Sequence, residues 1–522
     1  MVWPLKLTPF AGYAALLVGA ASIYAATVTI LLFQTRWVFS VPLVFASAFP
    51  LLIYASRNPR LLFLVGMVFT APLGLSINLR GYVHMGGAHA LSINLMDFFL
   101  VPLFVFLMRD FYLGYRRGFR FSTISLWWLG LIALGAYSVL IGPYRELAAF
   151  EVVRMTKEWL LYLVIINECV RQKHFHFVIG ALAANAAVNA AVAFVQFAIK
   201  RPIGLQPLGE VAMASSLGAN VGVYATVGEV FRVSGFAGHA NLYGPYLAML
   251  LPIFIGQLFT ETRFSTKALL AAVSASGLVA LALTLSRSGW LSFVVSGGIL
   301  MIALFALPDL RNRYVALKVL ALGLVGAMLV AGSGMILRRL TESDPGAFNF
   351  RLEWIEVAWK MVKEKPIFGF GLNSWIYQFT DYSRYSVLDL YDLFRDVFPV
   401  VHNVYMIVWS EQGTVGLLLF LALHANILWI AIKNLRYRGL SDRVSLLSIA
   451  AGCGVLAIMV DGMSSFFVKV QAFGRVFWIV VGLLVATHYW NLTNQALRRR
   501  TVGAASQDAL AGDVPNELIR KS

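Results

Sequence analysis

Long apolar stretches follow one another along nearly the whole chain and are separated by shorter polar segments. The hydrocarbon core of a bilayer is about 30 Å thick, so a helix needs about 20 mainly apolar residues to cross it. The pattern therefore predicts an all-α polytopic membrane protein with about 14 transmembrane helices, within a range of about 12 to 14. The expected spans are 10–33, 38–55, 61–79, 92–108, 124–142, 147–168, 177–199, 240–259, 268–285, 290–307, 314–334, 403–432, 444–463 and 472–491.

The composition agrees with a membrane protein and excludes several other classes. Among the 522 residues, 59% are hydrophobic and 13% are charged, and the mean hydropathy is +0.76. Soluble domains carry about 25% charged residues. Cys169 and Cys453 lie in or beside apolar segments, so we expect unpaired packing residues rather than a disulfide scaffold. The first apolar run is too long for the core of a secretory signal peptide, and we assign it as the first span.

The formal charge of +17 is explained by the orientation of the spans. Lys and Arg gather in alternate connecting segments, which is typical of cytoplasmic loops. These segments are 56–60, 109–120, 170–174, 261–267, 308–313, 433–443 and the tail after 491. Both termini are therefore expected in the cytoplasm, and no nucleic-acid partner is expected.

This topology divides the chain into six parts. They are 1–199 (N-terminal membrane helices), 200–239 (an outer loop), 240–334 (membrane helices), 335–402 (a large outer loop with amphipathic helices), 403–491 (C-terminal membrane helices) and 492–522 (a disordered cytoplasmic tail). Loops as long as the two outer ones are usually functional. We therefore expect the chemistry of the protein on the outer side.

Two arginines stand next to the outer ends of expected spans. Arg232 and Asn241 flank the start of the span 240–259, and Arg287 lies in the Ser-Arg-Ser-Gly turn 286–289. A guanidinium at such a place can hold an anionic group by two parallel hydrogen bonds. It can equally be an interfacial arginine whose charge reaches the lipid phosphates.

The large outer loop predicts an amphipathic helix followed by a glycine-rich turn. The helix begins near Arg351, carries Trp354 on its apolar face and ends at Lys365-Pro366, before Gly371. Aromatic rings with polar handles suit stacking on sugars, and they equally suit a belt at the membrane surface. Such residues follow the turn, at Trp375, Tyr377, Phe379, Tyr382, Tyr385, Tyr391, Phe394 and Phe398.

A histidine stands at the outer mouth of the span 403–432. His402-Asn403 is followed after nine residues by Gly413 and then by Gly416. Histidine can act as a base or a hydrogen-bond donor near neutral pH, although a lone histidine is usually structural. Glu411 lies about 13 Å deeper at 1.5 Å per residue, where an acidic side chain should face the bundle interior and find a partner.

Charged residues also fall inside the apolar segments. Glu151, Arg154 and Glu158 share one face of an expected helix, where they either form ion pairs or line a polar cavity. Asp97 and Asp461 are two further carboxylates within expected spans. Their partners are not evident from the sequence.

Several reaction classes lack their motifs in this sequence. It contains no Walker-type phosphate loop, no His-Glu-x-x-His and no Cys/His cluster with zinc spacing. The acidic residues Asp381, Asp389, Asp392 and Asp396 are scattered along the large loop, as on a solvated acidic face. We therefore expect no metal site and no cofactor.

Taken together, the four outer motifs resemble the O-antigen ligase and polymerase superfamily of bacterial polytopic membrane glycosyltransferases. The resemblance covers roughly residues 230–420 and implies a GT-C-like fold in the bacterial inner membrane, with a periplasmic active site. The matching pieces are Arg232-x-x-Gly235 with Asn241, Ser286-Arg287-Ser288-Gly289, Arg351-x-x-Trp354 with Pro366-x-x-Gly369-x-Gly371, and His402-Asn403-x9-Gly413-x-x-Gly416.

The resemblance also implies a donor, partners and residue roles. The donor would be a glycan on undecaprenyl pyrophosphate, transferred without metal or cofactor to a glycan or lipid A-core acceptor, in contact with membrane lipids and other polysaccharide assembly proteins. Arginines would contact the pyrophosphate, and the histidine would orient or deprotonate the acceptor hydroxyl. Expected catalytic residues are His402, Arg351 and Arg287, and expected substrate-binding residues are Arg232, Asn241, Asn403, Trp354, Gly371 and Glu411.

Three functions remain open at this point. A ligase would pass the finished glycan to lipid A-core in lipopolysaccharide biosynthesis, and the His-Asn-x9-Gly-x-x-Gly motif resembles the ligases most. A Wzy-type polymerase would join lipid-linked repeat units of an O-antigen or exopolysaccharide. A flippase or other transporter would use the intramembrane charges as a substrate path, but would leave the outer arginines and histidine unexplained.

Overall fold

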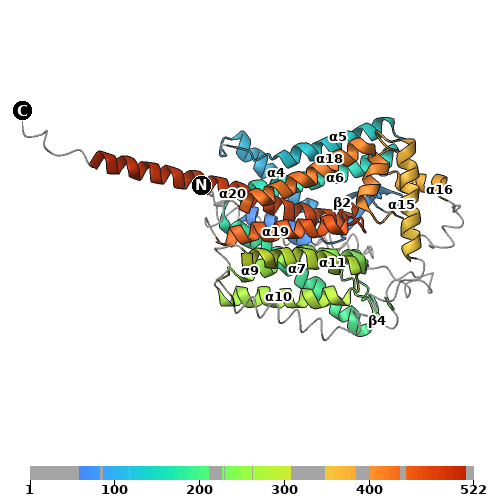
Figure 1. The fold of residues 1–522 in the computed structure, drawn as a ribbon, viewed down its shortest axis with the longest axis horizontal. Coiled ribbons are helices and arrows are strands. Elements are labelled where there is room, and N and C mark those ends of the chain that lie inside the picture. Colours follow the sequence, from blue (N-terminus) through green and yellow to red (C-terminus); the bar gives the residue numbers. More distant parts are fainter. Residues whose placement is uncertain are drawn as a thin grey trace, which may run out of the picture.

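The computed structural model describes residues 58–82, 86–116, 118–210, 226–227, 230–261, 263–306, 315, 347–383, 400–435 and 442–512. Within these residues the chain forms a bundle of long helices that run side by side along the longest dimension of the molecule (Figure 1). The expected spans 10–33 and 38–55, nearly all of 314–334, and the stretch 384–399 with four of the aromatic residues lie outside the described residues.

The bundle consists of helices of very different apolar length. Seven of the described helices, α5, α7, α10, α11, α18, α19 and α20, are long and apolar enough to cross a membrane, so the chain is a multi-pass membrane protein. The bundle helices are α3 (Pro59–Thr70), α4 (Asp97–Tyr112), α5 (Thr123–Ile141), α6 (Arg145–Glu168), α7 (Gln172–Ile199), α9 (Ala240–Leu258), α10 (Phe264–Leu283), α11 (Arg287–Ala306), α18 (Val404–Asn434), α19 (Asp442–Asp461) and α20 (Gln471–Gly512).

The helices also differ in how much of their surface the bundle covers. In α19 and α20, 89% and 83% of the spanning window is buried, whereas in α5, α10, α11 and α18 the share lies between 28% and 33%. The uncovered faces of the outer helices carry exposed apolar side chains such as Leu126, Val294 and Leu418. Large exposed apolar surfaces of this kind suit contact with lipid tails.

The first described segment differs from the expected pair of spans. α3 ends at Thr70 and is followed by an antiparallel hairpin of β1 (Ser76–Gly81) and β2 (Ala90–Asn94). Pro72 has no backbone N–H with which to continue the helical hydrogen bonds. The expected spans 61–79 and 92–108 therefore each include a strand, and helix occupies only α3 and α4 there.

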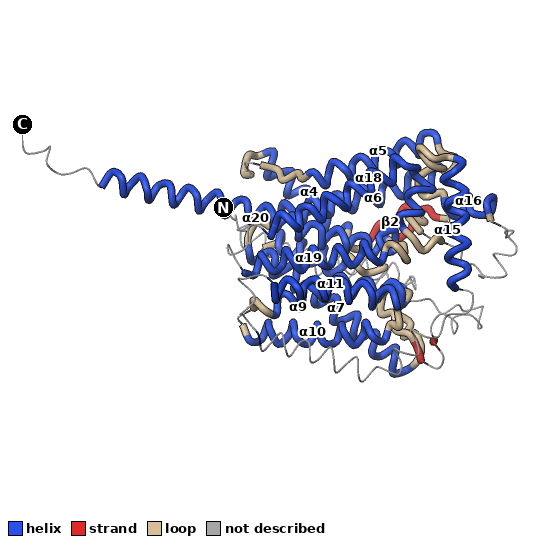
Figure 2. The backbone as a smooth tube through the Cα atoms, in the orientation of Figure 1, coloured by secondary structure: helices blue, strands red, loops and turns tan. Residues whose placement is uncertain are grey.

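The strands, the short helices and much of the connecting chain gather at one end of the bundle, called the loop end below (Figure 2). α15 (Ala347–Glu364) crosses the ends of the spanning helices there, with α16 (Trp375–Tyr382) beside it (Figure 1). α15 confirms the amphipathic helix expected from Arg351 to Lys365. Smaller elements of this end are η1 (Gln206–Leu208), β3 (Thr226–Val227), β4 (Val230–Phe231) and η3 (Phe467–Lys469).

The opposite end, called the tail end below, is where α20 leaves the bundle (Figure 1). α20 continues to Gly512, so most of the stretch 492–522, expected to be disordered, is helical. This stretch has no proline before Gly512 and is rich in Ala, Leu, Gln and Arg, which favour helix.

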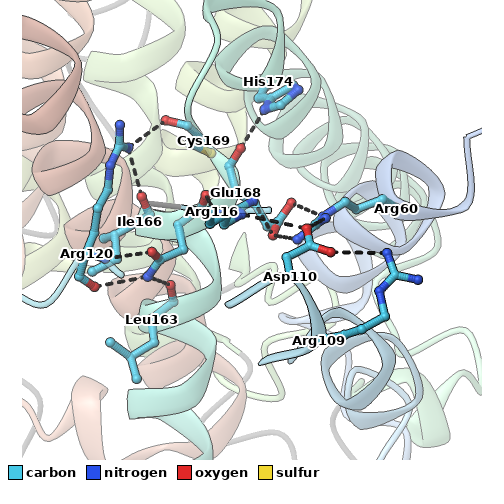
Figure 3. A network of polar contacts seen from close by, with 11 residues as sticks. Arg60, Arg109, Asp110, Arg116, Arg120, Leu163, Ile166, Glu168, Cys169 and His174 are labelled. Carbon is cyan, nitrogen blue, oxygen red and sulfur yellow. Dashed lines mark hydrogen bonds and ion pairs between the residues drawn. The ribbon is translucent and has the colours of Figure 1, made fainter. Parts of the chain in front are cut away.

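An ion network fixes the connections at the tail end (Figure 3). Arg60 of α3 donates to the two carboxylate oxygens of Glu168 at 2.6 and 2.7 Å and also contacts Asp110. Arg116 reaches Glu168 at 3.2 Å. Arg120 donates to a carbonyl oxygen in the last turn of α6 at 3.0 Å, where the helix dipole favours a positive charge. The network holds the α4–α5 connection against the C-terminus of α6.

Candidate active site

Arg232 is buried at the loop end, directly after β4. Its Nε donates to the carbonyl oxygen of Thr284 at 2.9 Å, and its Nη2 donates to the side-chain oxygen of Asn241 at 2.5 Å. Neither of these partners carries a charge, so the two contacts orient the guanidinium without neutralising it. The arginine and the asparagine of the first sequence motif are therefore in direct contact with each other.

His239 is the N-cap of α9 and lies close to residues of the other motifs. Its Nδ1 accepts a hydrogen bond from the backbone N–H of Asn241 at 3.0 Å, so this nitrogen carries no proton. Burial, and then electrostatic interaction with Arg232, His402 and Arg351, lower the pKa of His239 to about 3. The imidazole is therefore neutral at neutral pH.

The imidazole of His402 is held between two aromatic rings. It stacks on Trp354 of α15 with ring centroids 5.4 Å apart, and it meets the edge of Phe466 at 5.5 Å. Burial, and then the positive charge of Arg351, lower the pKa of His402 to about 4, against the opposite effect of the Val400 carbonyl. The ring is therefore neutral near pH 7 and offers a nitrogen lone pair.

Arg232, His239, Arg351 and His402 lie near one another and are called the site cluster below. Asp461, at the end of α19, is an acidic member of this cluster. It is buried, and its carboxylate lies near the hydroxyls of Ser288 and Ser465 and near the charge of Arg351. Within the described part of the chain, neither carboxylate oxygen has a hydrogen bond of good geometry. The carboxylate is thus part of the electrostatic environment of Arg351.

The second motif contributes Ser288 more directly than Arg287. Ser288 approaches Asp461, whereas Arg287 is exposed at the first position of α11. The turn is tightly packed, because a Cβ at Gly289 would lie 2.8 Å from the Cα of Gly244 in α9. This glycine therefore allows α11 to approach α9, and the catalytic role expected for Arg287 stays a prediction.

The third and fourth motifs are joined through their backbones in an arrangement called the Gly413 joint below. α18 is interrupted at Gly413, whose φ of 65° and ψ of −169° are not helical. The segment 366–371 supplies the hydrogen-bond partners that the interrupted helix lacks. Thr414 and Val415 donate to the carbonyls of Pro366 and Ile367 at 2.7 and 3.2 Å, and Phe370 and Gly371 donate to those of Ser410 and Glu411 at 3.1 and 2.8 Å.

The glycines of the joint leave no room for a side chain. A Cβ on Gly413 would lie 2.2 Å from the carbonyl oxygen of Ile367. A Cβ on Gly369 would lie 2.5 Å from the carbonyl carbon of Glu411. The glycine spacing of these two motifs is therefore explained by the contact between them.

Comparison with known families bears directly on these motifs. Residues 248–421 match the family model described as "O-Antigen ligase", and this region contains Arg287, Arg351 and His402, whereas Arg232 precedes it. This match confirms, over this region of the chain, the resemblance to the O-antigen ligase and polymerase superfamily that the motifs indicate.

A protein of Haemophilus influenzae, described as an uncharacterized protein, is also similar to this chain. The two are 23% identical over 213 residues, which cover 38% of this chain and 50% of that protein. The chain therefore spans about half the length of this curated relative.

Three further expected substrate-binding residues, like Arg232, Asn241 and Trp354, have partners within the protein itself. Asn403 caps α18, accepting from the backbone N–H of Met406 at 3.1 Å and donating to the carbonyl of Met463 at 3.2 Å. Gly371 belongs to the Gly413 joint. Glu411 accepts from Lys469 at 3.0 Å, which agrees with the partner expected for a buried acid. Their proposed contact with substrate stays a prediction.

A buried charge network lies below the candidate site. Lys469 bridges Glu151 of α6 and Glu411 of α18 at 3.1 and 3.0 Å. Arg154 pairs with Glu151 at 2.8 Å and with Glu158 at 2.6 Å. Lys469, Glu151 and Arg154 also line a cavity of ≈ 40 Å³, room for a few water molecules. These charges therefore form the ion pairs expected of them, and Glu151, Arg154 and Lys469 also form part of the wall of a cavity that is otherwise lined mainly by apolar side chains.

Sequence reasoning gave no role to three members of the cluster. His239 belongs to the first motif. The only signal for its role in the sequence is its position directly before the span 240–259, where it caps α9. Ser288 and Phe466 reach the site through packing between distant helices, which leaves no local sequence pattern. Among the described residues, no group of three or more His, Cys, Asp or Glu side chains is arranged to hold a metal ion.

Proposed function

We propose that this protein transfers a glycan from undecaprenyl pyrophosphate to an acceptor hydroxyl at the loop end, as an O-antigen ligase-like glycosyltransferase of the bacterial inner membrane. The proposal rests chiefly on the convergence of Arg232, Arg351, His239 and His402 from three separate connecting segments. The match of residues 248–421 to the O-antigen ligase family supports a lipid-linked donor. We assign the loop end to the periplasm, because the tail end carries the Lys- and Arg-rich connections.

The charges of the cluster suit a diphosphate. Arg232 and Arg351 are cationic, and the two histidines beside them are kept neutral by burial and by the neighbouring positive charge. A diphosphate between two guanidiniums accepts charge-assisted, bidentate hydrogen bonds. The leaving diphosphate gains negative charge during transfer, and donors that are already fixed in place stabilise that charge without a metal ion.

The proposed reaction is a substitution at the anomeric carbon. The acceptor oxygen forms a bond to that carbon, the bond from the carbon to the pyrophosphate oxygen breaks, and its electron pair leaves with undecaprenyl pyrophosphate. The hydroxyl proton passes to the neutral imidazole of His402. A bound diphosphate offsets the charge of Arg351 and so raises the proton affinity of His402 when the acceptor is deprotonated.

The acceptor separates a ligase from a polymerase that uses the same site. Purified full-length protein would be incubated in liposomes with the undecaprenyl-pyrophosphate glycan, EDTA, and either lipid A-core or a second lipid-linked repeat unit. Product on lipid A-core identifies a ligase, and a ladder of chain lengths identifies a Wzy-type polymerase. Flipping of the donor across the bilayer with neither product would contradict the proposal.

Two variants test the site within the same assay. Arg351→Ala and His402→Ala should each lower the rate of transfer by about 100-fold or more, because each removes a group that acts on the transition state. Tyr112→Ala, at a side chain that is 87% exposed at the tail end, is the matched control and should transfer at the wild-type rate. Wild-type rates in both site variants would place the chemistry elsewhere.

A further inference from the structure

Three tyrosines from separate segments form a partly exposed aromatic surface at the loop end, called the tyrosine surface below. Tyr82 follows β1, Tyr144 precedes α6, and Tyr377 lies in α16. The rings of Tyr144 and Tyr377 are 5.1 Å apart with planes 30° apart, and Tyr82 stacks on Phe150 at 6.2 Å. Tyr82 is 40% exposed and the other two tyrosines are half-buried, so the surface is open to solvent.

Charged groups of both signs surround these rings. Glu146 accepts a hydrogen bond from the hydroxyl of Tyr82 and pairs with Arg80 at 2.8 Å, and both charged side chains are exposed. Asp381 lies near Tyr144, whose pKa is raised by burial and then by this carboxylate. The Tyr144 hydroxyl therefore stays protonated and can donate. Carboxylates and guanidiniums can each bond two neighbouring hydroxyls of a ligand.

The tyrosine surface is continuous with the candidate active site. Asn373, just before α16, donates to the backbone carbonyls of Ala88 and Leu147 at 2.7 and 3.0 Å, which ties the hairpin, α6 and α16 together. Gly86 in the same hairpin packs on Val400, since a Cβ there would lie 2.7 Å from its side chain. Val400 is two residues before the proposed catalytic histidine. A ligand bound on the tyrosine surface would therefore lie beside the reaction centre.

This combination suits a carbohydrate better than a lipid surface or an apolar protein partner. Sugars offer apolar C–H faces to aromatic rings and hydroxyls at their edges to charged groups. The carboxylates of Glu146 and Asp381 would repel an anionic lipid headgroup. We infer, resting on the proposed function, that the tyrosine surface is a glycan subsite that holds sugar units of the transferred saccharide beside the reaction centre.

Binding of free glycan tests the subsite without any transfer reaction. The probe is the repeat-unit oligosaccharide released by mild acid from the surface polysaccharide of the producing strain, added to the full-length protein in detergent. Saturation-transfer NMR should give a Kd about tenfold higher for Tyr82→Ala/Tyr144→Ala than for wild type, a loss of about 1.4 kcal/mol. Tyr82→Trp keeps an aromatic face and should bind as wild type, as should the tail-end control Tyr112→Ala.

Transfer kinetics distinguish a glycan subsite from a merely structural role. The double alanine variant should raise KM for a donor with a full repeat unit and leave KM for a single-sugar donor unchanged. Equal losses for both donors, with a lower melting temperature, would overturn the inference, and so would an unchanged Kd. The singly substituted Tyr82→Ala serves if the double variant does not fold. Tyrosine-dependent binding without any transfer would support the subsite and count against the proposed function alone.

Discussion

Arg351 influences three ionisable neighbours at once, because it lies near His239, His402 and Asp461. Its charge helps to keep both imidazoles unprotonated in the absence of substrate. A bound anion would offset that charge and make the imidazoles better proton acceptors. Under the proposed function, one guanidinium would therefore couple the basicity of the site to binding of the donor.

The coupling predicts that Arg351→Gln raises the pKa of His402 from about 4 towards the usual value of about 6.5, without reaching it because burial remains. The pKa is lowered in the wild-type fold, so the imidazole of the wild type gains a proton only as the pH falls through about 4, and that of the variant gains it at higher pH. NMR titration of ¹³C-labelled histidine would measure both values. Arg287→Gln is the matched control, and an unchanged pKa in Arg351→Gln would contradict the placement.

At the scale of single residues, the sequence predicted that Arg232, Arg351 and His402 lie in one site, because the order and spacing of the motifs resemble those of a known superfamily. It could not predict the roles that Asn403 and Glu411 have in the fold. Their partners lie 60 and 58 residues further along the chain, and no local pattern marks such pairs.

At the scale of elements, the Gly413 joint links α18 to the chain that leaves α15. Both elements hold residues of the candidate site, since Trp354 and Arg351 belong to α15 and His402 lies two residues before the start of α18. The four backbone hydrogen bonds of the joint therefore fix the distance between the two halves of the site.

Gly413→Ala should destabilise the protein by roughly 1–3 kcal/mol or more, because alanine is strained at a φ of 65° and its Cβ would collide with Ile367. Gly298→Ala is the control, since Gly298 lies in helical backbone of α11 with open space around it. That change should be neutral or stabilising by about 0.4–1 kcal/mol. Thermal unfolding in detergent gives both values, and similar melting temperatures for the two variants would count against the joint.

Much of the element pattern could be predicted from apolar periodicity and from proline. α15 ends one residue before Lys365-Pro366, and α9, α18 and α19 begin and end within a few residues of the expected spans. The hairpin of β1 and β2 could not be predicted. The apolar residues of a strand next to a helix resemble a continuation of that helix, and the strand that pairs with them lies further along the chain.

At the scale of the whole molecule, the buried charge network connects helices that are distant in sequence. Lys469 follows α19, Glu151 belongs to α6 and Glu411 to α18. Each charge is removed from water, so each depends on the others for stabilisation. The network thus fixes how these helices pack below the candidate site.

Lys469→Met should destabilise the bundle by about 3–5 kcal/mol, because it leaves the buried carboxylate of Glu411 without its cation and Glu151 with Arg154 alone. Lys360→Met removes an exposed lysine that pairs with Glu356 at 3.0 Å, and it should cost no more than about 0.5 kcal/mol. Adding Glu411→Gln to Lys469→Met should restore part of the loss. Denaturation in detergent measures all three, and equal effects of the two lysine changes would show that the network contributes nothing.

The Gly413 joint also has a consequence for biogenesis. Gly413 lies about 13 Å below the start of α18, at a depth where hydrocarbon offers no water to satisfy free backbone groups. Their partners come from 366–371, which leaves the ribosome earlier. With the loop end in the periplasm, as proposed, the segment is exported across the bilayer and folds back to the bundle before α18 settles at its final depth. Translocation of the large loop and insertion of the next helix are thus ordered events.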